Sequence, residues 1–424
     1  MSALVSFVSL GLFGGCGLEA ISGNDNPDHL QVLEQTSANG SSATPALRVG
    51  QVLGGEADGF ARASKVVPFV FPRDHGAHPD YRSEWWYLTC PLRATGGSEY
   101  GVQFTLFRQA LTPPDPDNVA ELPVSKWRTG QLYMAHAALT DVTQKQHVES
   151  SRLVRGHPML AGVEAAPFSL WLEDWRLAET SAATNAMAPG SGASITDALV
   201  PGITALELDV QSAEFRTRLS LTPDKALVLQ GDRGLSYKGS QEASYYYSLP
   251  RLSVSGSVTP PGADLATPVT GSCWLDREWS TSVLADNLVG WDWFALQLND
   301  RSEFMLFQLR QKAGGEKQQS PAHLTSRLKQ GKHIATNGDA VALDSSALEF
   351  VPERYWRDET GALWPVEWTL QLMDRTLRVV AALDDQRMRS SIAYWEGLVW
   401  VFEGDADNKT RIGQGYLEMT GYTP

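Results

Sequence analysis

The sequence predicts an all-β protein in which two antiparallel barrels follow one another, after a leader segment and a tether. Two observations favour this fold. Short runs rich in aromatic and β-branched residues alternate with turn clusters of Gly, Pro, Asn and Asp. One hairpin pattern also returns in the second half of the chain, as expected when a structural unit is duplicated.

The strand-like runs begin near residue 66 and continue through the chain. In YGVQFTLF (100–107), alternate residues carry large apolar side chains, which is the period of a β-strand. Runs of the same kind are QLYMAHAAL (131–139), FSLWLEDW (168–175), FRTRLSL (215–221), WDWFALQL (291–298) and EFMLFQL (303–309). Both faces of these runs are partly aromatic, so alternation does not decide which face points into a barrel.

Two internal echoes support the duplication. The segment SEYGVQFTLFRQ (98–109) is answered by SEFMLFQLRQ (302–311), and each follows an aromatic run by one turn. A second echo relates residues 80–85 to residues 276–279, because both contain acidic and basic residues followed by Trp. Two tandem copies of one barrel account for both echoes. The alternative is a chance similarity between amphipathic hairpins.

Composition divides the chain into four parts. Residues 1–16 are a leader, and residues 17–65 are a tether rich in Gly, Ser, Asn, Asp and Ala. We expect the first barrel over 66–265 and the second over 266–424. The boundary is placed in the turn-rich stretch TPPGADLATP (259–268).

The leader is typical of exported proteins. Its apolar stretch is too short to span a bilayer and reads as a signal-peptide core. Cys16 follows Leu12-Phe13-Gly14-Gly15, which resembles a bacterial lipobox, although no Lys or Arg precedes Arg48. We therefore expect lipidation of Cys16 and a periplasmic or cell-surface location at the membrane. The alternatives are a secreted protein without an anchor and an uncleaved N-terminus.

Charge and composition exclude some partners. The formal net charge is −14 and no block of Lys or Arg is present, so nucleic acid is not expected to bind. The 14 Trp, 12 Tyr and 14 Phe residues favour an apolar small molecule or lipid as the partner. The sequence carries no dinucleotide, P-loop or nucleophile-elbow motif, so we expect no cofactor, and nothing indicates a serine hydrolase.

The segment FPRDHGAHPDYRSEWWYLT (71–89) combines many ionisable residues with an aromatic run. Its HxxH spacing, His75 to His78, lies in a Gly- and Pro-containing loop without a third ligand, so no metal site is expected. Buried charges are stable only when they are paired. We expect structural ion pairs that close one end of a barrel, formed by Arg82, Glu84, Arg277 and Glu278.

The candidate catalytic residues are Asp276, Tyr245, Tyr247 and His136. Asp276 lies between two Trp residues, and a carboxyl group buried among aromatic rings has a raised pKa and can donate a proton. The alternative for Asp276 is a salt bridge, and for the Tyr and His residues it is core packing. The two remaining cysteines, Cys90 and Cys273, lie in different expected domains, so we expect buried thiols, with a disulfide as the alternative.

Several motifs together resemble a known family. They include PRDHGAHPDYRSEWWYLT, LQGDRGLSYKG, ASYYYSLPRL, LDREWS, GWDWFALQL, YWEG and GYLEMTGY, which span residues 72–422. The chain resembles the secreted AttH-like members of the carotenoid 1,2-hydratase superfamily. The resemblance implies two lipocalin-like barrels and an apolar pocket. Some members are encoded beside ABC transporter permeases, and the hydratases add water to a terminal double bond of acyclic carotenoids.

The resemblance extends to the site only in part. The hydratases carry a pattern like Tyr-His-Asp-His-Asn-Trp where this chain has Trp274-Leu275-Asp276-Arg277-Glu278-Trp279. Asp276 and Trp279 match, and neither His does. The resemblance implies that Asp276 is the proton donor. The expected ligand-binding residues are Trp86, Gln103, Trp274, Trp279, Trp291 and Trp293.

Two functions therefore compete. In the first, the protein binds a long polyene, terpenoid or lipid and hydrates an alkene with Asp276 as the acid. In the second, it is a non-catalytic lipid-binding lipoprotein that acts with an ABC transporter. A secreted hydrolase is a weaker alternative.

Overall fold

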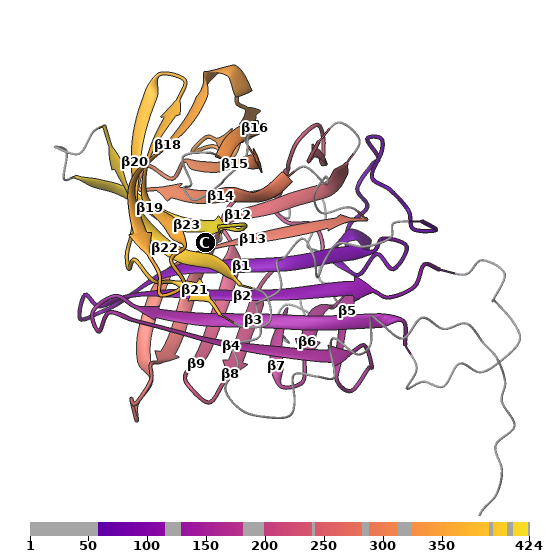
Figure 1. The fold of residues 1–424 in the computed structure, drawn as a ribbon. Helices are drawn as coiled ribbons and strands as arrows, with labels where there is room; N and C mark the ends of the chain where they lie inside the picture. The colour runs from indigo at the N-terminus through magenta and orange to yellow at the C-terminus, as the bar shows by residue number, and fades with distance from the viewer. Residues whose placement is uncertain are drawn as a thin grey trace, which may run out of the picture. The chain divides into compact units, whose positions relative to one another are not determined.

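The computed structural model describes residues 58–114, 129–180, 199–239, 242–281, 288–312, 324–389, 393–404 and 410–422. Within these ranges the chain forms two antiparallel β-sheets and two short 3-10 helices, η2 (Arg73–His75) and η5 (Ser345–Ala347), without an α-helix (Figure 1). The predicted all-β class is confirmed. No helix in these ranges has the length and apolar character that a membrane crossing requires.

The first sheet has thirteen strands, with the order β4-β3-β2-β1-β13-β12-β9-β8-β7-β6-β5 and with β10 and β11 paired to β12. Its strands are β1 (Ser83–Ala94), β2 (Glu99–Ala110), β3 (Gln131–Asp141), β4 (Gln146–Arg155), β5 (Ala161–Ala165), β6 (Phe168–Leu172), β7 (Trp175–Glu179), β8 (Leu206–Gln211), β9 (Arg216–Pro223), β10 (Val228–Leu229), β11 (Leu235–Tyr237), β12 (Ala243–Thr259) and β13 (Thr267–Ser280).

The second sheet has ten strands, with the order β17-β16-β15-β14-β23-β22-β20-β19-β18 and with β21 paired to β22. Its strands are β14 (Leu288–Leu298), β15 (Glu303–Lys312), β16 (Leu324–Ile334), β17 (Ala340–Ala342), β18 (Leu348–Arg357), β19 (Leu363–Leu372), β20 (Arg375–Ala381), β21 (Arg387–Met388), β22 (Tyr394–Glu403) and β23 (Arg411–Met419).

The two strand orders show the duplication directly. In each sheet three strands lie on one side of a central pair, β1–β13 or β14–β23. On the other side of the pair the next strand, β12 or β22, also pairs with short additional strands, β10 and β11 or β21. The hairpin β1–β2 therefore corresponds to β14–β15, as the first sequence echo predicted. Two barrel-like sheets of this kind confirm the tandem lipocalin-like fold.

The second sequence echo and the expected boundary are corrected by the strand pairing. Glu84 lies opposite Trp279 on the neighbouring strand, so residues 80–85 and 276–279 are neighbours in one sheet and not copies of each other. Strand β13 belongs to the first sheet, and the second sheet begins with β14 at Leu288. The change of sheet thus falls after Ser280 and not near residue 265, because the turn at 260–266 only joins β12 to β13.

The expectation of two free thiols is wrong. Cys90 and Cys273 form a disulfide with 4.1 Å between their Cα atoms. Thr89 lies opposite Trp274 on β1 and β13, which places the next residues, Cys90 and Cys273, opposite each other as well. The predicted boundary at residue 265 places the two cysteines in different domains, so the sequence did not indicate that they lie close together.

Each sheet packs on both faces. One face of the first sheet surrounds a core that includes Trp86, Leu88 and Leu275, and one face of the second surrounds a core that includes Phe294 and Trp368. The opposite faces of the two sheets contact each other through a third cluster, to which Tyr87 and Tyr246 contribute from the first sheet and Trp293 and Phe307 from the second. A cavity lies beside this third cluster, and several of the cluster's residues line it.

Candidate active site between the two barrels

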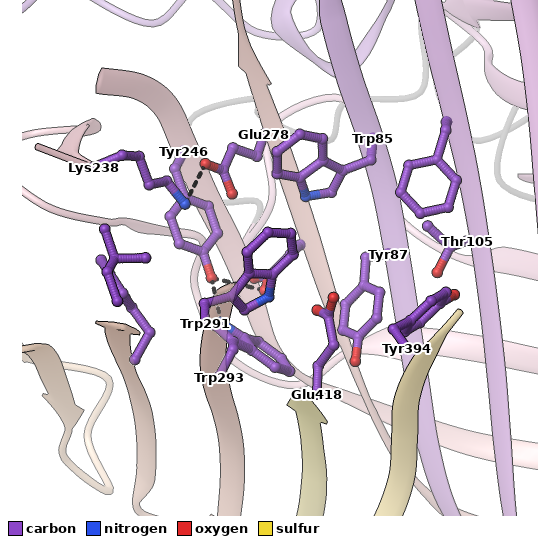
Figure 2. A pocket seen from close by; sticks show the side chains of 14 residues that line it. Trp85, Tyr87, Thr105, Lys238, Tyr246, Glu278, Trp291, Trp293, Tyr394 and Glu418 are labelled. Atoms are coloured by element: carbon purple, nitrogen blue, oxygen red, sulfur yellow. Dashed lines mark hydrogen bonds and ion pairs between the residues drawn. The ribbon is translucent and has the colours of Figure 1, made fainter. Parts of the chain in front are cut away.

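A cavity lies where the outer faces of the two sheets meet (Figure 2). The room for the centres of water-sized molecules is about 60 Å³, and all the space up to and including the open mouth is about 750 Å³. Apolar and aromatic rings dominate its walls. The lining residues are Trp85, Tyr87, Thr105, Phe107, Lys238, Tyr246, Asp276, Glu278, Trp291, Trp293, Phe307, Leu309, Tyr394 and Glu418.

The cavity is built from equivalent positions of the two sheets. Tyr87 on β1 lies opposite Asp276 on β13. Trp293 on β14 lies opposite Glu418 on β23 in the same way. The register of the neighbouring strands extends this relation to six pairs, which account for twelve of the 14 lining residues: Trp85 and Trp291, Tyr87 and Trp293, Thr105 and Phe307, Phe107 and Leu309, Tyr246 and Tyr394, and Asp276 and Glu418.

Asp276 is the most firmly held carboxyl group of the cavity. It is 3% exposed, and both of its oxygens accept hydrogen bonds. The hydroxyl of Tyr246 donates to Oδ2 at 2.7 Å, and the indole N–H of Trp274 donates to Oδ1 at 2.7 Å, as does the hydroxyl of Ser248. Burial raises the pKa of Asp276 to about 7, against the effect of these three donors. Asp276 can therefore change its charge near neutral pH.

Glu418 brings a second carboxyl group to the cavity from β23. It is half-buried, and Figure 2 shows it pointing into the cavity, as Trp291 does from β14. Burial raises the pKa of Glu418 to about 8, and the nearby charges of Glu278 and Asp276 add to this effect. The attraction of Lys238 and a hydrogen bond from Trp291 act in the opposite direction. Glu418 is therefore largely protonated at neutral pH.

A further carboxyl group lies just behind the wall. Glu396 on β22 is opposite Glu418 and accepts a hydrogen bond from the hydroxyl of Tyr87. Burial raises the pKa of Glu396 well above its usual range, with a further contribution from the charge of Glu418. Close carboxyl groups with raised pKa values are typical of acid–base catalytic sites.

One end of the cavity carries an ion pair without an equivalent in the lining of the second sheet. Lys238 Nζ lies 2.8 Å from Glu278 Oε1. The same ammonium group is 5.2 Å from the ring centroid of Phe307, a distance that permits a cation–π interaction. This end is more polar than the rest of the wall, so it can receive an oxygen-bearing group of a ligand. Glu278 was predicted to form a structural ion pair, and its partner is Lys238.

His136 lies one side chain away from the cavity. It is fully buried on β3, and its Nδ1 is 2.8 Å from the hydroxyl of Tyr394, which lines the cavity. Burial lowers the pKa of His136 to about 3, so the ring is neutral. His136 thus holds a wall residue in place and does not reach the cavity itself.

The structure does not bring Tyr245 and Tyr247 to Asp276. Both side chains point into the core of the first barrel, because alternate residues of β12 face opposite sides and Tyr246 takes the cavity side. The hydroxyl of Tyr247 lies 2.7 Å from Nδ1 of His75, and that of Tyr245 donates to the carbonyl of Lys65 at 2.9 Å. Their distance from the cavity leaves Tyr246 as the tyrosine that contacts Asp276.

The expected ligand-binding residues separate into three groups. Trp291 and Trp293 line the cavity. Trp274 supports Asp276 from behind, and the amide of Gln103 donates to Thr105 at 2.6 Å. Trp86 and Trp279 lie in the core of the first barrel, where they contact Arg277. Sequence reasoning missed Trp85, Tyr87, Tyr246, Tyr394, Lys238 and Glu418, although the motifs EWWY, YYY, YWEG and GYLEMTGY contain five of them.

The charged segment at 71–89 is resolved as an ion-pair cluster inside the first barrel. Glu84 is fully buried and accepts hydrogen bonds from both Arg108 and Arg277. Arg277 also lies over the ring of Trp86, 3.9 Å from its centroid. Burial alone would raise the pKa of Glu84, but Arg277 and Arg108 hold it well below its usual range. Arg82 was expected in the same set of ion pairs, and its backbone N–H lies 3.5 Å from the hydroxyl of Thr281. Cys16, the expected lipidation site, lies outside the described residues.

Comparison with known proteins agrees with this architecture. The sequence matches the family described as AttH-like over residues 62–422. The chain belongs to the AttH-like family. A crystal structure of an AttH protein from Nitrosomonas europaea is 29% identical with a TM-score of 0.67, over 86% of this chain and 100% of that one. No curated protein matched the sequence.

The same fold occurs in an enzyme. The crystal structure of kievitone hydratase from Nectria haematococca aligns with this AttH-like chain with a TM-score of 0.57 and 14% identity, over 86% of this chain and 97% of the hydratase. At this identity the similarity establishes the fold alone. The motifs that suggested the family from the sequence, EWWY, DREW and GYLEMTGY, lie on β1, β13 and β23, the strands that carry the cavity.

Proposed function

We propose that this AttH-like protein is a hydratase-like enzyme that binds an apolar, unsaturated small molecule between its two barrels and adds water to a carbon–carbon double bond. The observation that carries the proposal is Asp276, a buried carboxyl group with a pKa of about 7 in the wall of an aromatic cavity. Polyenes, terpenoids and unsaturated lipids are the substrate classes that such a wall fits.

The chemistry requires a proton donor, a stabilised cation and a water molecule. A protonated carboxyl group transfers its proton to one alkene carbon, which leaves a carbocation on the other. Trp85, Trp291 and Tyr87 line the cavity, and the π face of an aromatic ring stabilises a nearby cation. Water then bonds to the cationic carbon and releases one proton to a base, so that alkene and water give an alcohol.

The chain's own residues also supply the polar surroundings that the reaction needs. Tyr246, Ser248 and Trp274 fix the carboxyl group of Asp276 in one orientation, and preorganised groups of this kind lower the barrier without reorganisation. The pair of Lys238 and Glu278 offers hydrogen-bonding groups to an oxygen-bearing end of the substrate.

The second candidate function is non-catalytic binding of a lipid, with delivery to an ABC transporter. The observation that favours it is the use of Arg277, which replaces a His of the hydratase pattern, in the structural pair with Glu84. In either case we propose export and a lipid anchor at Cys16. Replacing Cys16 by Ser should move the protein from the membrane fraction to the soluble fraction of its host. A protein that stays with the membrane after this change would contradict the anchor.

The two candidate functions are separated by mass spectrometry of the organic extract of the purified protein. The extract of the wild type is compared with that of the Asp276→Asn variant. A ligand that is heavier by one water in the wild-type extract supports hydration. The same unmodified ligand in both extracts would leave only the binding function. Two empty extracts would argue against an apolar ligand for either function.

A further inference from the structure

The two carboxyl groups at equivalent positions of the cavity differ in the hydrogen bonds they receive. Asp276 accepts from three donors, two at Oδ1 and one at Oδ2. A carboxylate offers about four acceptor positions, so three are occupied and one remains on Oδ2. This arrangement stabilises the ionised form of Asp276 and leaves one lone pair free to accept a proton from water.

Glu418 has the opposite surroundings. One side-chain donor, Trp291, reaches it. The residue opposite Glu418 on β22 is Glu396, where the first sheet has Ser248 opposite Asp276. At these equivalent positions Asp276 therefore has a hydroxyl donor as its neighbour, whereas Glu418 has a second carboxyl group. Burial and the charges of Glu278 and Asp276 disfavour ionisation of Glu418, and a single side-chain donor offers its carboxylate little compensation, so Glu418 holds its proton.

We propose that Glu418 is the proton donor of the hydration and that Asp276 is the base that removes a proton from the attacking water. The proposal rests on the function proposed above and deepens it. It reverses the role of acid that the sequence indicated for Asp276. Both groups project into the same cavity from opposite sheets, so a substrate bound between the sheets has one carboxyl group on each side.

The proton transfers balance over one turnover. The O–H bond of Glu418 breaks and a C–H bond forms at one alkene carbon. A C–O bond then forms between water and the cationic carbon, and one proton of the water passes to Oδ2 of Asp276. Glu418 ends ionised and Asp276 ends protonated. Return of this proton from Asp276 to Glu418, through water that enters as the product leaves, restores the starting state.

The first test asks which carboxyl group holds the proton and needs no substrate. Infrared spectra of the full chain near neutral pH resolve the C=O stretch of protonated carboxyl groups. Glu418→Gln should remove one band that Asp276→Asn retains. Glu396→Gln is the matched control and should remove a different band. Loss of the band in Asp276→Asn, with retention in Glu418→Gln, would overturn the assignment.

The second test separates the two proton transfers. Geranylgeraniol, an acyclic alkene with a hydroxyl end, is incubated with the protein in D2O. The wild type should add one water to a double bond and form a diol that carries one deuterium on carbon. Asp276→Asn should exchange deuterium into the alkene without forming the diol, because protonation of the alkene still occurs and attack by water does not. Glu418→Gln should do neither, with at least a hundredfold loss of both signals.

The outcomes distinguish this proposal from the function on which it rests. Deuterium exchange that survives in Glu418→Gln and is lost in Asp276→Asn would overturn the assignment and keep the hydratase function. A wild-type protein that adds no water to geranylgeraniol or to the alkene in its own extract would overturn both the assignment and the hydratase function, even if the infrared band belongs to Glu418.

Discussion

Tyr246 and Tyr394 occupy equivalent positions in the two sheets but make different hydrogen bonds. Tyr246 donates to Asp276 at 2.7 Å, and Tyr394 lies 2.8 Å from Nδ1 of His136. The indole N–H of Trp293 also donates to the hydroxyl of Tyr246, at 3.1 Å. Tyr246 therefore hydrogen-bonds to a carboxyl group of the cavity, whereas Tyr394 connects the cavity wall to the buried His136 on β3.

This difference predicts the effect of removing each hydroxyl. Tyr246→Phe should raise the pKa of Asp276 by about one pH unit, because a hydrogen bond to a charged group contributes roughly 1.5–3 kcal/mol. The pKa is measured by 13C NMR of protein labelled at Asp. Tyr394→Phe is the matched control and should leave the pKa of Asp276 unchanged. Equal shifts in the two variants would show that the cavity as a whole, and not this hydrogen bond, sets the pKa.

The raised pKa of Asp276 also predicts how stability depends on pH. The pKa rises from 3.8 to about 7, so the folded protein keeps a proton that the unfolded chain releases. The unfolding free energy should therefore fall as pH rises from about 4 to about 7. Three pH units at roughly 1.4 kcal/mol each give an upper limit of about 4 kcal/mol. The hydroxyl of Tyr246 and the charge of Glu278 act on this carboxyl group, and its charge in turn acts on Glu418.

Urea denaturation at pH 5 and pH 8 measures this effect. Asp276→Asn, which cannot ionise, should be more stable than the wild type at pH 8, by up to a few kcal/mol, and should differ less at pH 5. Such a gain would mark Asp276 as a group kept for function at a cost in stability. A variant that is less stable than the wild type at both pH values would contradict the prediction, and the three hydrogen bonds to the carboxylate would then outweigh its burial.

Local patterns predicted the strands, the duplication and the buried charges. Runs such as YGVQFTLF follow the strand period, and the hairpin echo survives because both copies fold into the same strands, β2 and β15. Charge balance predicted that Glu84 and Arg277 take part in buried ion pairs, since buried charges need partners, but it did not indicate that they pair with each other.

The position of the site could not be predicted in the same way. Each sheet buries both faces, so Tyr245, Tyr246 and Tyr247 are all buried and alternation gives no preference. The cavity forms only when two sheets meet, and Glu418 approaches Asp276 from a different sheet. Nothing in the spacing of the two residues indicates that they line the same cavity. The disulfide was missed for a related reason, because β13 was assigned to the wrong barrel.

The ion-pair cluster at Glu84 predicts the opposite pH behaviour to that of Asp276. Glu84→Gln would leave the guanidinium groups of Arg108 and Arg277 buried without a carboxylate, which costs about 3–5 kcal/mol. Because the pKa of Glu84 is lowered, its contribution is present above the unfolded pKa of about 4.5 and is lost as pH falls. Thermal unfolding between pH 3 and pH 7 should show this loss in the wild type and a flatter profile in the variant.

An exposed ion pair provides the control for this prediction. Arg218 pairs with Asp209 on the surface of the first sheet, where such pairs contribute about 0–1 kcal/mol. Asp209→Asn should therefore change the unfolding free energy by less than about 1 kcal/mol. If Glu84→Gln is no more destabilising than Asp209→Asn, the cluster does not hold the barrel end together.

The disulfide predicts a large effect on the stability of the first sheet. Cys90 and Cys273 are 183 residues apart in the sequence, and cross-linking a loop of this length removes chain entropy worth about 5 kcal/mol in the simplest treatment. The double variant Cys90→Ala and Cys273→Ala should lower the unfolding free energy by roughly 2–5 kcal/mol, measured by urea denaturation. Wild-type protein with dithiothreitol is the matched comparison, and it should approach the variant only after unfolding, because both sulfurs are fully buried. A variant as stable as the oxidised wild type would mean that strand pairing between β1 and β13 already fixes this part of the barrel without the covalent link.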